Sequence, residues 1–341
     1  MNTTLDTRRV TIFLVFAFGI AWAVGLIVYF SGGLVNSPVI VPGANITLAL
    51  VLVAIGYMWA PALANIFTRL LTREGWRETG LRPRFSRGWL YWLAAWVLPA
   101  VFTIVGMVIF FGLFPQYYDP SLKVISNLLA QAGQPDVVDP WIIVIAQTVQ
   151  AIIIAPFINS LFTFGEEFGW RAYLQPKLMP LGGHKAILLT GVIWGVWHWP
   201  IIAMGHNYGL DYPGAPWLGM LAMAWFTFTS GTFLGWATLR SGSVWPAVVG
   251  HAAINGISSL GVLLMQGEPS PLLGPIAVGV VAGLGWALMA GLLFLWPNAL
   301  SAPIPESLPE PVTAVAPTFV EIKPQPVDPS KLDDTRFTSQ V

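Results

Sequence analysis

The sequence has no cysteine and very few charged residues. The lack of cysteine excludes disulfide bonds, thiolate metal sites and a cysteine nucleophile. Only 9% of the 341 residues are charged, whereas soluble domains carry about 25%. The formal net charge is zero, so no overall field attracts nucleic acid, and we expect no nucleic-acid partner. The chain instead has 55% hydrophobic residues and 17 tryptophans, a composition typical of a multi-pass integral membrane protein.

Long apolar runs predict an all-α fold, a polytopic bundle of transmembrane helices. A helix of about 20 apolar residues crosses the hydrocarbon core of a bilayer. The first run follows Arg8 and Arg9, as in a signal peptide, but it is long for one, and we interpret it as an uncleaved helix. We predict about eight spans: Val10–Phe30, Ile46–Leu70, Gly88–Phe114, Trp141–Phe164, Lys185–Met204, Trp217–Leu239, Ser243–Met265 and Leu272–Trp296.

Basic residues predict the orientation of these spans. The loops after the first and third runs hold a single basic residue, Lys123, whereas alternate loops are rich in arginine. The positive-inside rule then places both termini in the cytoplasm. It also places Glu166 and Glu167 near the cytoplasmic end of the fourth span. The basic residues on this side are Arg8, Arg9, Arg69, Arg73, Arg77, Arg82, Arg84, Arg87, Arg171, Lys177, Lys185 and Arg240.

Composition divides the chain near residue 297. Residues 1–296 form the predicted transmembrane helical domain. Residues 297–341 are rich in proline and polar residues, in stretches such as SAPIPESLPEPVTAV. Such a segment cannot bury enough apolar surface to fold by itself. We therefore predict that it is a disordered cytoplasmic tail.

Polar side chains inside three of the runs are the candidate functional residues, because ionisable groups within spans are costly and usually functional. Glu167 and Arg171 are four residues apart, so they share a helix face and can pair. Glu166 lies about 100° further round the helix. Pro200, just after the fifth-run histidine, should kink or end that helix. The candidates are Glu166, Glu167 and Arg171 at the end of the fourth run, His198 in the fifth, and His251 and Asn255 in the seventh.

These residue types suit hydrolysis by an activated water. A partly desolvated carboxylate is a competent general base, and a histidine beside it helps to activate water. A second histidine and an asparagine can donate hydrogen bonds to an oxyanion. No serine or threonine in these runs has an obvious neighbouring base in sequence. The pattern therefore favours acyl transfer with water as the nucleophile.

The same residues resemble the motifs of the CPBP family, the CAAX-processing and bacteriocin-processing intramembrane endopeptidases. GEEFGWRAYLQPKL resembles the family motif EExxxR, and HAAIN, from His251 to Asn255, resembles HxxxN. The family motif FxxxH is WxxxH here, from Trp194 to His198, a departure at the aromatic position. The resemblance covers about residues 140–265.

The resemblance implies a glutamate-dependent intramembrane endopeptidase without a cofactor, in a bacterial plasma membrane. It implies a peptide or lipidated protein as substrate, and membrane lipids are the other expected partners. The implied roles are as follows: Glu166 is the water-activating base, helped by His198; His251 and Asn255 stabilise the oxyanion; Glu167 and Arg171 shape and hold the site; Trp194 walls the pocket.

Other interpretations of the same polar cluster stay open. Two histidines and two glutamates can ligate zinc in a membrane metalloprotease, although HExxH is absent and the ligands are dispersed over three helices. The cluster can also bind a proton or ion in a transporter, or belong to a scaffold or immunity protein without catalysis. His184 and His206 lie in predicted loops, where we expect them to be solvated.

Overall fold

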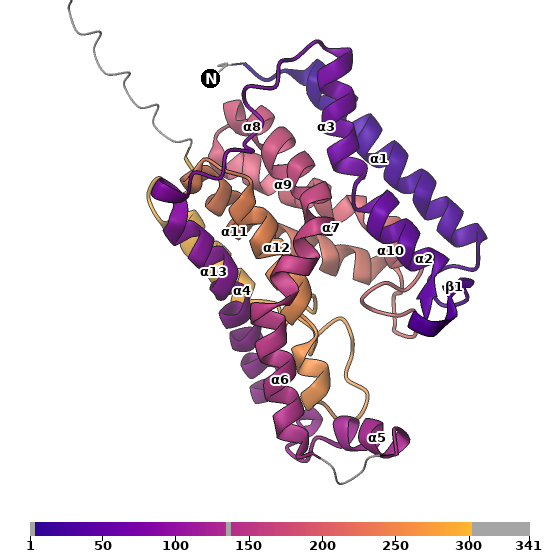
Figure 1. The fold of residues 1–341 in the computed structure, drawn as a ribbon. Coiled ribbons are helices and arrows are strands. Elements are labelled where there is room, and N and C mark those ends of the chain that lie inside the picture. The colour runs from indigo at the N-terminus through magenta and orange to yellow at the C-terminus, as the bar shows by residue number, and fades with distance from the viewer. Residues whose placement is uncertain (1–3, 134–137, 302–341) are drawn as a thin grey trace, which may run out of the picture. The chain divides into compact units, whose positions relative to one another are not determined.

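Helices form nearly all of the regular structure (Figure 1). The structure, a computed structural model, describes residues 4–133 and 138–301. Within these residues the strands are β1 (Val39–Val41) and β2 (Ile46–Thr47), which form a small antiparallel hairpin. The α-helices are α1 (Thr7–Phe30), α2 (Leu48–Val51), α3 (Ala60–Leu71), α4 (Phe85–Leu113), α5 (Lys123–Gln131), α6 (Pro140–Ile153), α7 (Ala155–Gly169), α8 (Gln175–Leu178), α9 (Gly183–Trp197), α10 (Trp199–Ala203), α11 (Trp217–Ser241), α12 (Trp245–Ile257) and α13 (Leu284–Leu295). Short 3₁₀ or π segments cover Pro42–Ala44, Leu52–Tyr57, Pro115–Tyr117, Trp170–Leu174, Met179–Leu181 and Leu260–Leu264.

The all-α polytopic class is confirmed. In the part of the chain that the structure describes, five helical stretches are long and apolar enough to cross a membrane, and six if a pair of helices bent by 47° counts as one span. They correspond to the first, second, third, fourth, sixth and seventh predicted runs. They are Thr7–Phe30, Leu48–Leu71, Gly88–Leu113, Trp217–Ser241 and Trp245–Leu264, with Pro140–Ile153 and Ala155–Leu181 as the bent pair.

The other two of the eight predicted runs hold shorter helices. In the fifth, α9 ends at Trp197 and α10 starts at Trp199, with Pro200 in its first turn. The fifteen residues of α9 span roughly 22 Å, less than the ~30 Å hydrocarbon core. In the eighth run, α13 begins at Leu284 because residues 271–283 form turns around Pro271 and Pro275. Hydropathy counts apolar residues, whereas a span also needs an unbroken helix.

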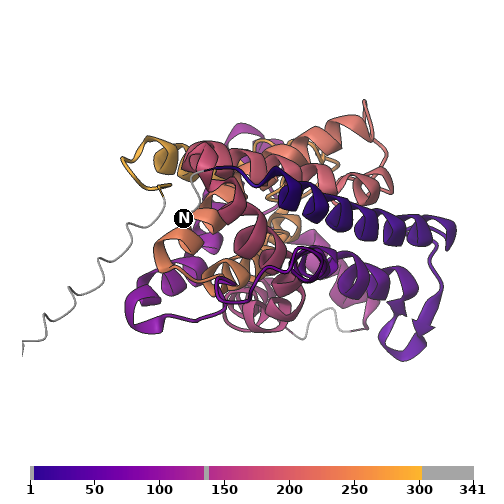
Figure 2. The same cartoon turned by 90° about the horizontal axis from the view of Figure 1, so that it is seen from above.

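Helix α11 forms the centre of the helical unit. In its most apolar stretch 72% of the residues are buried, compared with 22% in α1. It packs against α9, α13, α12 and α4, while α1 and α3 lie side by side away from it (Figure 1 and Figure 2). Helices away from the centre expose large apolar side chains, as contact with lipid requires. Examples are Leu26, Phe30, Leu90, Val108, Ile145, Phe157 and Leu161.

Two glycines bring α7 against the start of α3. A Cβ atom added at Gly165 would lie 2.7 Å from the carbonyl oxygen of Met58, and one added at Gly169 would overlap Pro61. Side chains larger than hydrogen therefore have no room along this line of contact. The close approach fixes the position of α7 along its axis and its rotation about that axis. Helix α7 carries the two adjacent glutamates.

The predicted tail lies almost wholly outside the described residues. Residues 302–341 are not described, so its disorder and the domain boundary at residue 297 stay predictions. Of the described residues beyond that boundary, Ala299 and Leu300 are buried and belong to the main apolar core. The apolar core therefore includes residues a few positions past Trp296.

Candidate active site

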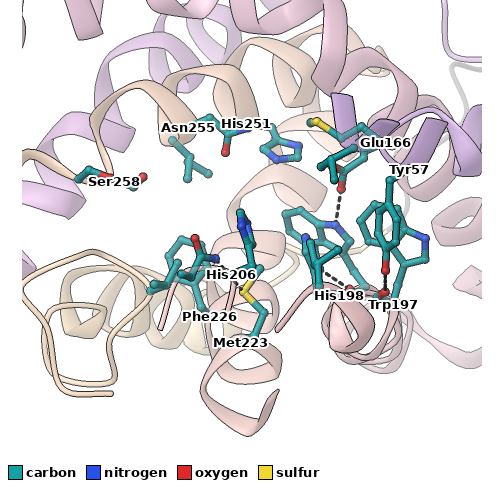
Figure 3. Close-up of a pocket in the computed structure, with 18 residues that line it drawn as sticks. Tyr57, Glu166, Trp197, His198, His206, Met223, Phe226, His251, Asn255 and Ser258 are labelled. Atoms are coloured by element: carbon teal, nitrogen blue, oxygen red, sulfur yellow. Dashed lines mark hydrogen bonds between the residues drawn. The ribbon is translucent and has the colours of Figure 1, made fainter. Parts of the chain in front are cut away.

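Three helical regions meet around a cavity of about 310 Å³. They are α7, the junction between α9 and α10, and α12. Four of the residues singled out in the sequence as catalytic line this cavity: Glu166, His198, His251 and Asn255 (Figure 3). Trp194 lines it as well, whereas Glu167 and Arg171 lie behind it. Side chains from residues almost 90 positions apart are thus gathered around one space.

Glu166 has one oxygen held by protein. Its side chain is 2% exposed, and Oε2 accepts a hydrogen bond from the indole Nε1 of Trp194 at 2.6 Å. Among the described residues, no protein donor bonds to the other oxygen, Oε1. A carboxylate arranged in this way keeps a free lone pair for a water molecule in the cavity.

Glu167 faces the protein interior and joins two helices. Its Oε1 accepts from Nη1 of Arg171 and from Nδ1 of His251, each at 2.9 Å. The pairing of Glu167 with Arg171 that their spacing predicts is confirmed. The Arg171 guanidinium carbon also lies 4.3 Å from the centre of the Trp194 ring, which adds a cation–π attraction. A buried ion pair needs this kind of compensation, because both charges are removed from water.

The hydrogen bonds of the two histidines define which ring nitrogen carries a proton. His198 has Nδ1 2.8 Å from the carbonyl oxygen of Trp194, and His251 has Nδ1 bonded to the Glu167 carboxylate. Both partners only accept hydrogen bonds, so each Nδ1 carries the hydrogen. Both imidazoles therefore leave Nε2 for the cavity. In a neutral His198 this nitrogen is a base.

The break after α9 is held from outside the helix. Helix α9 ends at Trp197. The carbonyl of Trp197 lacks its usual helical partner, because the N–H of Ile201 bonds to the carbonyl of His198 instead. The hydroxyl of Tyr57 donates to the Trp197 carbonyl at 2.5 Å, and the indole of Trp22 donates to it at 3.3 Å. These two donors fix the position of His198 next to the break.

Two hydrogen bonds, about one helical turn apart, hold α12 against α7. Thr163 donates to the carbonyl of Val248, and Asn159 donates to the carbonyl of Ala252. These bonds set the rotation of α12 so that His251 points to Glu167. Asn255, one turn further on, is exposed and lines the cavity.

The expectation that His206 is solvated was wrong. It is half-buried and lines the cavity, and Figure 3 shows it across from His251 and Asn255. Burial lowers its pKa. The loop is folded inward, because the Tyr208 hydroxyl donates to the carbonyl of Val278 at 2.9 Å. His184, by contrast, is exposed as expected, although it lies at the start of α9 and not in a loop.

Tyr57 is another cavity residue that sequence reasoning missed. The available signal was a lone tyrosine within an apolar run. Its partner, the Trp197 carbonyl, is 140 positions away, and no local pattern shows such a contact. As for metals, no group of three or more His, Asp or Glu side chains in residues 4–133 and 138–301 is arranged to hold an ion.

Two comparisons with known proteins bear on this site. Residues 139–257 match a family model described as type II CAAX prenyl endopeptidase Rce1-like. The chain is also 30% identical over 102 residues to "CAAX prenyl protease 2" of Methanococcus maripaludis. That alignment covers 29% of this chain and 37% of the archaeal protein. The resemblance that the motifs predict is confirmed for this segment, which contains all three motifs.

Proposed function

We propose that this protein is an intramembrane endopeptidase, in which Glu166 and His198 activate a water molecule that attacks a peptide carbonyl. The gathering of Glu166, His198, His251 and Asn255 around one cavity carries the proposal. Oε1 of Glu166 and Nε2 of His198 are the acceptors for the two water protons. The match of residues 139–257 to an endopeptidase family supports the same reaction class.

The chemical steps follow from these positions. Glu166 takes a proton as the water oxygen bonds to the carbonyl carbon, which gives a tetrahedral oxyanion. His251 and Asn255 donate hydrogen bonds to that oxyanion, each worth about 2.7–4 kcal/mol in the transition state. The carbon–nitrogen bond then breaks, and protonated Glu166 returns its proton to the leaving amine. The products are a carboxylic acid and an amine.

His251 must be an imidazolium to play this part. Its Nδ1–H already donates to Glu167, so a second donation, from Nε2, requires a proton on both nitrogens. The Glu167 carboxylate that accepts from Nδ1 of His251 also pairs with Arg171.

The substrate class in this proposal is a lipidated peptide at the membrane. The relative from Methanococcus maripaludis is named a CAAX prenyl protease. Apolar residues that suit such a chain also line the cavity: Val53, Met58, Ile201, Met223, Phe226, Ile254 and Val278.

The test is cleavage in proteoliposomes of a farnesylated peptide that ends in a CAAX-type sequence. We expect Glu166→Gln to lower the rate by about 10²–10⁴-fold, as loss of a general base does. Glu268→Gln, the same change at an exposed glutamate, is the control and should cleave normally. The peptide without its farnesyl group tests the lipid, and a chelator tests the zinc alternative. Equal cleavage by wild type and Glu166→Gln contradicts the proposal.

We further propose that the site opens toward the cytoplasm, and the absence of cysteine makes this easy to test. The arginine-rich loop between α3 and α4 supports the orientation. Single cysteines at Arg82 in that loop and at Gln116 in the next loop can be labelled in intact cells without first removing others. An impermeant thiol reagent should label the Gln116→Cys variant and spare the Arg82→Cys variant. The reverse pattern contradicts the cytoplasmic assignment.

A further inference from the structure

We propose that Trp194 is a positioning residue, whose indole N–H holds the Glu166 carboxylate with its other oxygen left for the water that the proposed reaction uses. The inference rests on the proposed function, because it concerns the base of that reaction. The indole donates to Oε2 of Glu166 at 2.6 Å. A donor bonded to a carboxylate favours its charged form, and a hydrogen bond to a charged group is stronger than a neutral one.

The surroundings of Trp194 leave its ring little freedom. The side chain is 2% exposed. One face lies 4.3 Å from the Arg171 guanidinium carbon, and the ring meets His251 edge-on with centres 5.1 Å apart. The Trp194 carbonyl accepts the Nδ1–H of His198. One residue therefore contacts the base, its partner histidine and the charged pair behind the site.

Close packing of α9 on α11 sets this position. A Cβ atom added at Gly195 would lie 2.5 Å from Cα of Ala224, and one added at Gly191 would lie 2.7 Å from Cα of Phe228. At Gly231 of α11, an added Cβ would come within 3.0 Å of Nη2 of Arg171 and 3.7 Å of the Trp194 ring. The glycines of both helices thus make room for the indole and the guanidinium together.

The indole N–H of Trp194 is a hydrogen-bond donor that the motif resembled by this chain does not have at that position. FxxxH has phenylalanine where this chain has Trp194. Phenylalanine keeps an aromatic ring at that position but has no N–H. Trp194→Phe therefore removes the hydrogen bond to Glu166 while it keeps a ring beside Arg171 and His251, and the backbone bond to His198 is untouched.

The experiment measures rate against pH for the farnesylated peptide in proteoliposomes. For Trp194→Phe we expect the acidic limb of the profile to move up by about one pH unit, as loss of a charge-assisted hydrogen bond predicts. We also expect kcat to fall about tenfold with KM unchanged. Trp286→Phe is the control: Trp286 is fully buried and its indole donates to Thr103 at 3.4 Å, outside the cavity. The Trp286→Phe variant should leave both the acidic limb of the pH–rate profile and the cleavage rate unchanged.

A second readout does not need activity. In infrared difference spectra, the protonated carboxyl band that Glu166→Gln removes should appear at higher pH in Trp194→Phe than in wild type. If Trp194→Phe does not fold, a benzothienylalanine at position 194, in which sulfur replaces the indole N–H, takes its place.

Each outcome decides one of the two proposals. A loss of rate without movement of the limb overturns the positioning role. If wild type cleaves no peptide, or Glu166→Gln cleaves as well as wild type, the endopeptidase proposal fails, and the infrared titration alone decides the role of Trp194. An unchanged infrared titration in the Trp194 variant overturns it.

Discussion

His251 and Arg171 share one acceptor: both donate to Oε1 of Glu167, each at 2.9 Å. A residue on α12 and one just after α7 are thereby tied through a single oxygen. The three side chains are almost completely buried. Oε2 of Glu167 and the Nε and Nη2 of Arg171 are buried without a hydrogen-bond partner among the described residues, so the stability of the unit depends on the charge pairing itself. Removing one partner leaves a buried charge unpaired.

The first prediction separates the stability of this unit from its function. Arg171→Met leaves Glu167 buried without its cation, and we expect it to lower the free energy of unfolding by about 3–5 kcal/mol. Adding Glu167→Leu should recover most of that loss, because a well-packed apolar pair can replace a buried ion pair. Activity should stay lost in the double variant, since His251 then has no carboxylate. Thermal unfolding and peptide cleavage measure the two effects.

The second prediction concerns the free nitrogen of His198. The amide of an asparagine at this position can reproduce the bond that Nδ1 makes to the Trp194 carbonyl, but it has nothing at the place of Nε2. We expect His198→Asn to fold with nearly normal stability and to lose about 10²–10⁴-fold in rate. His198→Ala should be less stable, because the Trp194 carbonyl is left unpaired. Normal cleavage by His198→Asn would show that Nε2 takes no part.

The third prediction tests the contact between α7 and α3. Gly165→Ala places a methyl group 2.7 Å from the Met58 carbonyl oxygen, and such overpacking costs about 1–3 kcal/mol. Gly19→Ala on α1 is the matched control, since no atom lies within 4 Å of its added Cβ. There we expect a gain of about 0.5–1 kcal/mol from lower chain entropy. Opposite signs in thermal unfolding support the packing argument, whereas equal effects contradict it.

The sequence was informative where function depends on spacing along one helix. The pairing of Glu167 with Arg171 needs only a four-residue repeat, and the structure has that bond. The break at Pro200 follows from proline's missing N–H. Hydropathy does not register this break, so the fifth apolar run is predicted as a span although α9 ends at Trp197.

Contacts between distant segments were beyond the reach of the sequence. The bond from Trp194 to Glu166 depends on how α9 rotates against α7, which Gly191 and Gly195 set through their packing on α11. His206 was misjudged for the same reason: a loop residue becomes a cavity residue only when the Tyr208 hydroxyl bonds to Val278. Neither of these two contacts can be predicted from a local sequence pattern.

The last prediction concerns acid stability and a carboxylate outside the spans. Glu74 accepts hydrogen bonds from Lys177 and from the hydroxyl of Tyr173, and Nε of Arg9 lies 3.5 Å from its Oε2. Burial alone would raise the pKa of Glu74, but these partners outweigh it and the pKa is lowered. A carboxyl group with a depressed pKa adds stability above its unfolded pKa of about 4.3, and this stability is lost as the pH falls through the folded value.

Wild type should therefore lose stability on acidification from about pH 5 toward pH 3, and Glu74→Gln should lose less, because an amide does not titrate. At pH 7 Glu74→Gln should be less stable than wild type, because Lys177 has lost its charged partner. Glu268→Gln, at an exposed position, should follow the wild-type curve throughout. Parallel curves for wild type and Glu74→Gln would mean that the Glu74 cluster adds nothing to acid sensitivity, and that the contact between the loop after α3 and α8 is held by packing alone.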